Sequence, residues 1–112
     1  MIYISILTFA VSAILGLMIL IKWLTKKDAS KKVIYSHGIT AAAALVILII
    51  YALGHPDNFP KASIILFVIA AIGGFYMFIN DLRGKFSPMA VAFIHAVLAV
   101  AGFVTLLTFV FL

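Results

Sequence analysis

The sequence predicts an all-α integral membrane protein, a four-helix bundle made of two tandem helical hairpins. Three observations lead to this fold class. Of the 112 residues, 67% are hydrophobic and 10% are charged, whereas soluble domains are about half apolar and a quarter charged. Four long apolar runs divide the chain, and its second half repeats the first at an offset of 58 residues. A soluble domain of this length cannot bury so much apolar surface.

Each apolar run is long enough to cross a membrane. The runs cover residues 2–21, 33–53, 62–79 and 89–112, and about 20 residues of helix span a hydrocarbon core of roughly 30 Å. We therefore expect helices at about 2–22, 33–53, 61–80 and 88–112, within a single membrane domain of residues 1–112. Ser87 and Pro88 are typical of a helix start, as the N-cap and the first helical residue.

The connections between the runs predict the orientation in the membrane. The first connection carries five lysines, and the third carries Arg83 and Lys85. The middle connection, which contains His55 and Pro56, is nearly neutral. Basic loops usually stay in the cytoplasm, so we expect both termini outside, in the periplasm of a bacterial inner membrane. The net charge of +5 then reports orientation, and no nucleic acid partner is expected.

The internal repeat pairs residues 1–54 with residues 59–112. At the offset of 58, fifteen of fifty aligned positions are identical from Ser5/Ser63 onward, against roughly one in ten expected by chance for this biased composition. Each copy would be a hairpin with a basic turn, and two such copies have the same topology in the membrane. The identical pairs include Phe9/Phe67, Gly16/Gly74, Lys27/Lys85, His37/His95, Ala41/Ala99 and Leu48/Leu106.

His37 and His95 are the most informative identical pair. Both lie about 8 to 10 Å inside their expected helices on the basic side, from the rise of 1.5 Å per residue. Polar side chains inside a membrane are costly and are candidates for function. Two equivalent imidazoles suggest an axial pair on one metal, and the iron of haem b is the best candidate because histidine is a common haem ligand.

The surroundings of the two histidines fit a flat cofactor. Ala41 and Ala99 lie one turn beyond His37 and His95, and small residues leave room for a macrocycle between helices. Arg83 and Lys85 lie on the same side of the membrane, where they would pair with anionic propionates. Small residues in membrane helices also simply permit close packing. A duplicated packing histidine therefore remains an open interpretation. Gly73 and Gly74, with Gly16 as the partner of Gly74, are expected to let the first and third helices approach each other closely.

Four membrane helices with a histidine pair from alternate helices resemble the small membrane b-type cytochromes, of the ascorbate-reducible and the superoxide- or quinone-linked kinds. The resemblance spans the bundle and depends on His37 and His95. It implies single-electron transfer near the cytoplasmic face, with a quinone or a redox protein as partner. Members of that group commonly carry two haems, whereas here the third histidine, His55, lies in the outer connection without an equivalent. The resemblance thus implies one haem per chain, or further sites completed in a homo-oligomer.

Other function classes are less well supported by the residues. No carboxylate lies within an apolar run and no cysteine is present, so acid-coupled drug transport, thiolate chemistry and hydrolysis have no candidate groups. Two alternatives to the cytochrome stay open. The first is a non-catalytic membrane subunit or assembly factor. The second is a small transporter gated by histidine, a residue whose pKa ordinarily lies near neutrality. The segment at His55 is more typical of a turn than of a metal site.

Overall fold

The computed structural model describes residues 1–112 and contains four α-helices and no strand. The helices are α1 (Ile2–Leu24), α2 (Lys31–Gly54), α3 (Lys61–Leu82) and α4 (Met89–Phe111). All four are long and apolar enough to cross a membrane. The prediction of an all-α fold with four helices that can span a membrane is confirmed.

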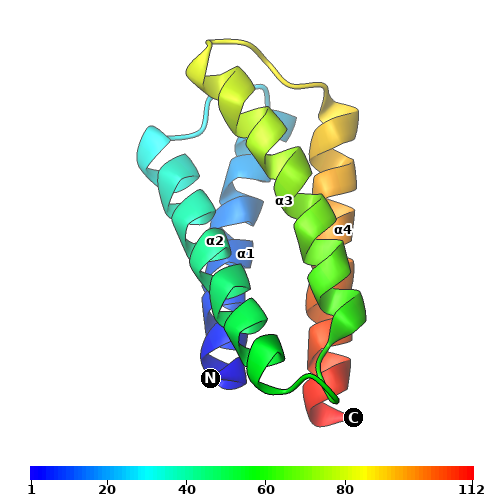
Figure 1. Cartoon of the computed structure of the whole chain (residues 1–112). Helices are drawn as coiled ribbons and strands as arrows, with labels where there is room; N and C mark the ends of the chain where they lie inside the picture. Colours follow the sequence, from blue (N-terminus) through cyan, green and yellow to red (C-terminus); the bar gives the residue numbers. More distant parts are fainter. The chain divides into compact units, whose positions relative to one another are not determined.

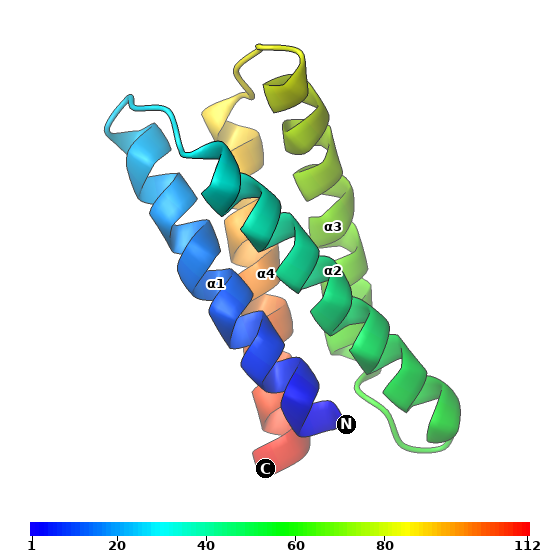
Figure 2. The same cartoon turned by 90° about the vertical axis from the view of Figure 1, so that its left-hand side faces the viewer.

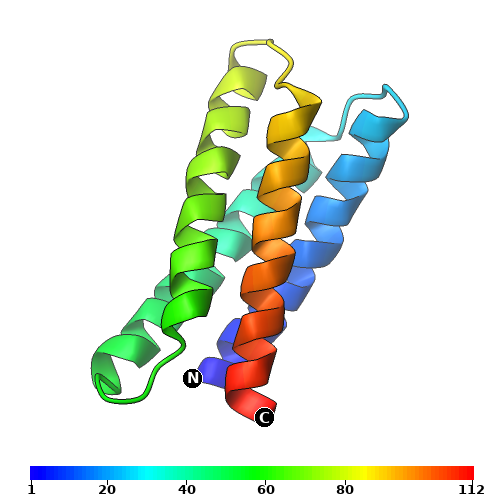
Figure 3. The same ribbon diagram turned by 90° about the vertical axis from the view of Figure 1, so that its right-hand side faces the viewer.

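The chain forms two compact units, each of which is a helical hairpin. The first unit covers Met1–Asn58 and the second Phe59–Leu112, so the second begins at the residue where the second repeat was expected. In the first hairpin α1 packs along α2 (Figures 1 and 2). In the second, α3 packs along α4 (Figure 3).

The end of α1, the start of α2 and the end of α3 each extend two residues beyond the prediction. The predicted start of α4 requires a correction. Pro88, not Ser87, is the N-cap: it has an extended ψ of 137°, and Met89 is the first helical residue. The carbonyl of Pro88 accepts the first bonds of the helix, from the N–H groups of Val91 and Ala92. The Ser87 hydroxyl instead accepts a hydrogen bond from the Asn80 side chain, at 3.2 Å, so it is not used as a cap.

The two basic turns end their helices in the same way. In α3, the Lys85 N–H donates to the Asn80 carbonyl and the Gly84 N–H to the Asp81 carbonyl, with Gly84 at φ 69°. This is the Schellman pattern, which places a left-handed residue just after the helix. In α1, Lys27 and Lys26 make the equivalent bonds, with Lys26 at φ 58°.

Within each hairpin the helices meet along a narrow seam of residues spaced three and four apart. This spacing is that of a coiled-coil interface. All eight buried residues of the first hairpin have a buried counterpart 58 positions later in the second. The pairs are Ile2/Pro60, Ser5/Ser63, Phe9/Phe67, Ser12/Ala70, Ile19/Met77, Ile34/Ala92, Ala44/Gly102 and Leu48/Leu106. The two hairpins therefore bury the same register.

The seam contains serines as well as apolar residues, and each buried serine is hydrogen-bonded across the hairpin. The Ser5 hydroxyl donates to the Ala44 carbonyl at 2.9 Å. The Ser63 and Thr105 hydroxyls lie 2.9 Å apart. No buried side-chain nitrogen or oxygen lacks a partner, as a chain surrounded by hydrocarbon requires, because lipid offers no hydrogen bonds.

The left-handed lysine of the first turn leads to a stability prediction. Lys26→Gly should stabilise the protein by about 1 kcal/mol, because a side chain costs roughly that much in the left-handed region and glycine does not. Thermal unfolding in detergent measures the change. Lys27→Gly is the matched control, since it removes the same charge without relieving a positive φ. Equal shifts for the two variants would show that charge, not backbone conformation, is responsible.

Candidate functional site

His37 lies on α2 and is held against α1 through its ring nitrogen. Its Nδ1 atom is 2.8 Å from the backbone carbonyl oxygen of Ser12. A carbonyl oxygen can only accept, so Nδ1 donates and carries the proton. In the neutral ring, Nε2 is then the nitrogen that bears the lone pair. The hydrogen bond thus fixes both the tautomer and the direction of the imidazole.

Ser12 binds the same histidine with its side chain. The Ser12 hydroxyl oxygen lies 3.2 Å from His37 Nδ1 and donates to the His37 backbone carbonyl at 3.2 Å. Only 3% of Ser12 is exposed. Because the Ser12 hydroxyl and carbonyl and His37 Nδ1 are all hydrogen-bonded to one another's helices, the contact joins α1 to α2 without using lipid as a partner.

His95 makes the equivalent contact in the second hairpin. Its Nδ1 atom lies 2.6 Å from the backbone carbonyl oxygen of Ala70, which is 58 positions after Ser12. Ala70 has no hydroxyl, so its backbone carbonyl accepts the imidazole proton without the side-chain contact that Ser12 adds in the first hairpin. In both histidines, the ring nitrogen that does not bind this carbonyl is Nε2.

A glycine faces each imidazole, four residues after the carbonyl that binds it. A Cβ atom added to Gly16 would lie 2.8 Å from His37 Cε1, and one added to Gly74 would lie 3.1 Å from His95 Cε1. On a helix, a side chain leans back over the preceding turn. A side chain at either position would thus cover the carbonyl that the histidine uses, and glycine leaves that carbonyl open.

Of the other predicted cofactor-binding residues, two lie in the helix seams and two lie in the turn after α3. Ala41 and Ala99 are half-buried and continue the seam one turn beyond His37 and His95. Arg83 and Lys85 are exposed in the turn after α3, where their backbone N–H groups complete the helix end.

The predicted ligands His37 and His95 belong to different compact units, and each is positioned by its own hairpin. Sequence reasoning missed Ser12 and Ala70, which act through their backbone carbonyls. It also expected Gly16 and Gly74 to serve only the approach of helices, whereas each faces the histidine of its own hairpin. The signal for these residues was present in the spacing of three and four residues that links them in the seam.

His55 is separate from these contacts. It is the residue after α2, and its Nδ1 donates to the Tyr51 carbonyl at 2.9 Å. Its ring stacks on the Tyr51 ring with centroids 4.0 Å apart. His55 is exposed and eighteen residues beyond His37, a rise of roughly 27 Å along a helix.

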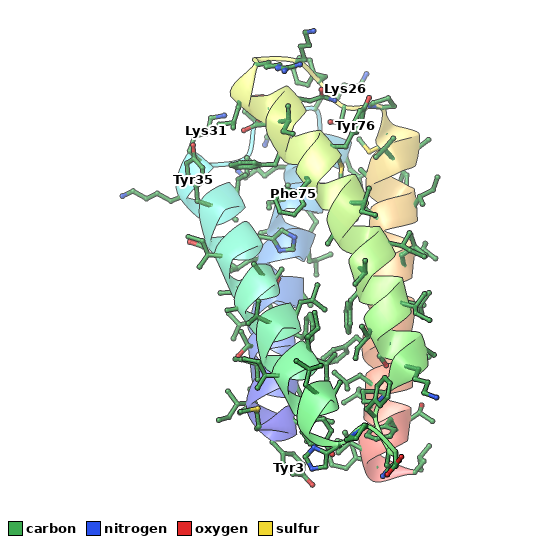
Figure 4. All side chains as sticks on the ribbon, in the orientation of Figure 1. Tyr3, Lys26, Lys31, Tyr35, Phe75 and Tyr76 are labelled. Atoms are coloured by element: carbon green, nitrogen blue, oxygen red, sulfur yellow. The ribbon has the colours of Figure 1, made fainter.

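Aromatic side chains mark the ends of the first hairpin. Figure 4 shows Tyr3 at the end opposite to Lys26, Lys31 and Tyr35. Tyrosines are enriched where a helix leaves the hydrocarbon, and Tyr3 and Tyr35 are both exposed. Their positions agree with a hairpin whose length spans a membrane. On α3, Phe75 and Tyr76 (Figure 4) are likewise exposed.

Comparisons with protein-family models, with curated proteins and with solved structures gave no match.

The contact between Ser12 and His37 leads to a second prediction. Ser12→Ala gives the first hairpin the residue that the second hairpin has at Ala70. We expect a loss of about 0.6 kcal/mol, the average for a hydrogen bond between membrane helices, and an unchanged Nδ1–H tautomer of His37. Unfolding in mixed detergents measures the first, and nitrogen NMR of labelled histidine rings the second. Ser36→Ala, an exposed serine beside His37, is the control. Loss of the tautomer would show that the hydroxyl, not the carbonyl, holds the ring.

Proposed function

We propose that the protein is a membrane b-type cytochrome that holds one haem b through Nε2 of His37 and His95 and transfers single electrons near the cytoplasmic face. The observation that carries this proposal is the pair of Nδ1–H···O=C hydrogen bonds, at 2.8 Å to Ser12 and 2.6 Å to Ala70. When a neutral histidine donates from Nδ1, its lone pair is on Nε2, and this is the nitrogen through which such a ring binds a metal.

The hydrogen bonds also match what metal-binding histidines need from their surroundings. Such residues almost always donate the other ring N–H to a carbonyl or carboxylate, which fixes the ring and raises the basicity of the ligand nitrogen. A histidine that only filled space would not require a specific tautomer. The equivalent contacts of His37 and His95 support a role for the two residues as a pair.

Haem would supply an iron that accepts and releases one electron, with its potential set by axial ligands, burial and hydrogen bonding. The chain would contribute the two imidazoles and the small residues Ala41 and Ala99 beside them. Arg83 and Lys85, exposed at the basic turn, would pair with the propionates at the water boundary. The partner would be a quinone in the bilayer or a redox protein at the basic face.

Each of the eight buried residues of the first hairpin has a buried counterpart 58 positions later in the second. This agreement supports an origin of the chain by duplication of one hairpin. A duplication places one histidine in each copy at the same register. A single haem would then use one ligand from each copy, and a homo-oligomer would repeat that arrangement.

A second function is favoured by the same contacts. The bonds from His37 to Ser12 and from His95 to Ala70 each tie two helices together, so the histidines would serve stability alone in a non-catalytic membrane subunit or assembly factor. Such a protein would be colourless.

Absorption spectra decide between the two functions. We expect the purified protein to show a Soret band and sharp α and β bands after reduction with dithionite. His37→Ala and His95→Ala should each lose the reduced bands, because a bis-histidine iron needs both ligands. His55→Ala is the matched control and should keep the wild-type spectrum, since His55 is exposed at the other end of α2. A featureless wild-type spectrum after expression with added haem would refute the cytochrome function.

We also propose that the basic turns face the cytoplasm of a bacterial inner membrane. The chain has no cysteine, so a single introduced cysteine reports its own position. In intact cells stripped of the outer membrane, Asn58→Cys should react with an impermeant maleimide. Lys85→Cys should react only after the membrane is opened. Both residues are exposed in turns. The reverse pattern would place the basic turns outside.

A further inference from the structure

We infer that Gly16 and Gly74 are positioning residues for the two proposed haem ligands, because each leaves open the backbone carbonyl that orients an imidazole. The part of the inference that concerns haem ligands rests on the proposed function. The arrangement itself, a histidine on one helix with a carbonyl and a glycine four residues apart on its partner, is present in both hairpins.

The first step is the identity of the atoms near each glycine. The three heavy atoms that an added Cβ at Gly16 would meet are His37 Cε1 at 2.8 Å, Nδ1 at 3.2 Å and Nε2 at 3.5 Å. At Gly74 they are the same three atoms of His95, at 3.1, 3.6 and 3.9 Å. Glycines that serve only close helix approach face the backbone of the partner helix. Here the imidazole ring, and not the backbone, occupies the space.

The second step is the position of each glycine relative to the acceptor. Gly16 follows Ser12 by four residues, and Gly74 follows Ala70 by four, so each glycine lies directly above the carbonyl that binds the histidine. A methyl group there would collide with the ring and would also shield the carbonyl. The ring beside Gly16 would have to shift, and the ring beside Gly74 would have to give by a few tenths of an ångström. Because the methyl group also covers the carbonyl, we expect this movement to break the hydrogen bond.

The third step is the contrast with the other helical glycines. An added Cβ at Gly38, which is next to His37, would meet nothing within 4 Å. One at Gly73, next to Gly74, would lie 3.8 Å from His95 Cβ and 3.9 Å from Nδ1, which are ordinary contacts. An added Cβ at Gly102 would also meet a ring, that of Phe67 at 3.1 Å, but this ring belongs to another contact. Among the glycines near the two histidines, only the residue four positions after the acceptor carbonyl would press a Cβ against the imidazole. Gly38 and Gly73 therefore serve as matched control positions.

The decisive experiment compares Gly74→Ala with Gly73→Ala in the full-length chain. The first readout is nitrogen NMR of labelled histidine rings in haem-free protein in detergent micelles. We expect Gly74→Ala to lose the hydrogen-bonded Nδ1–H signal of His95 while that of His37 persists. Gly73→Ala should keep both signals. Gly16→Ala should lose the His37 signal, and Gly38→Ala should keep it.

The second readout is haem binding by the same variants. Loss of an outer-sphere hydrogen bond usually lowers metal affinity by about tenfold or more, so Gly74→Ala should bind haem about tenfold more weakly than Gly73→Ala. Gly16→Ala has the closer contact and, if it does not fold, the Gly74 pair decides alone, because a 3.1 Å contact is relieved by a small movement of the ring.

The outcomes separate this inference from the proposed function. If Gly74→Ala retains the His95 Nδ1–H signal, the glycine does not position the ring and the inference is overturned, whatever the haem result. If the signal is lost but the affinity of Gly74→Ala for haem equals that of Gly73→Ala, the role in ligand positioning is overturned. If wild-type protein binds no haem, the proposed function and the role in ligand positioning fail together, and the NMR comparison still decides whether glycine orients the histidine.

Discussion

The hydrogen bond from an imidazole Nδ1 to a backbone carbonyl of the neighbouring helix determines much of the architecture of each hairpin. In hydrocarbon, a polar side chain must find its partner within the protein. His37 and His95 find theirs in carbonyls that already accept the bonds of their own helix, which requires the ring to approach the helix surface closely. In both hairpins a glycine follows the acceptor by four residues and leaves room for that approach. Tautomer, ring direction and helix spacing are therefore consequences of one contact.

Polar and small residues share the seams with large apolar ones such as Leu48 and Leu106. Lipid is as apolar as leucine, so burying leucine between membrane helices gains little, and packing and hydrogen bonds hold the helices together. The buried serines and the histidines occupy successive levels of the same interface, while residues such as Leu7 and Ile14 are exposed on the outside of the first hairpin. The seams thus contain hydrogen-bonded serines, while large apolar side chains also face outward.

The four helices could be predicted from the sequence because length and apolar composition suffice to specify a membrane span. The pairing of His37 with His95 in the repeat was likewise visible in the sequence. The acceptors at Ser12 and Ala70 were not, because a backbone carbonyl carries no side-chain signature and its availability depends on a residue one turn away. The start of α4 was placed one residue early because Ser87 has a competing partner, the Asn80 side chain. That competition depends on how the turn folds back.

The two helix ends share one backbone pattern, but the left-handed position holds Gly84 in the second hairpin and Lys26 in the first. Left-handed backbone disfavours lysine by about 1 kcal/mol. A lysine at the surface of an anionic leaflet gains about 1 kcal/mol from lipid headgroups. The two terms are of equal size, so a strained residue at this turn is tolerated where negatively charged lipid is present. The folding stability of the first hairpin should consequently depend on lipid composition, whereas that of the second, with glycine at this position, should depend on it less.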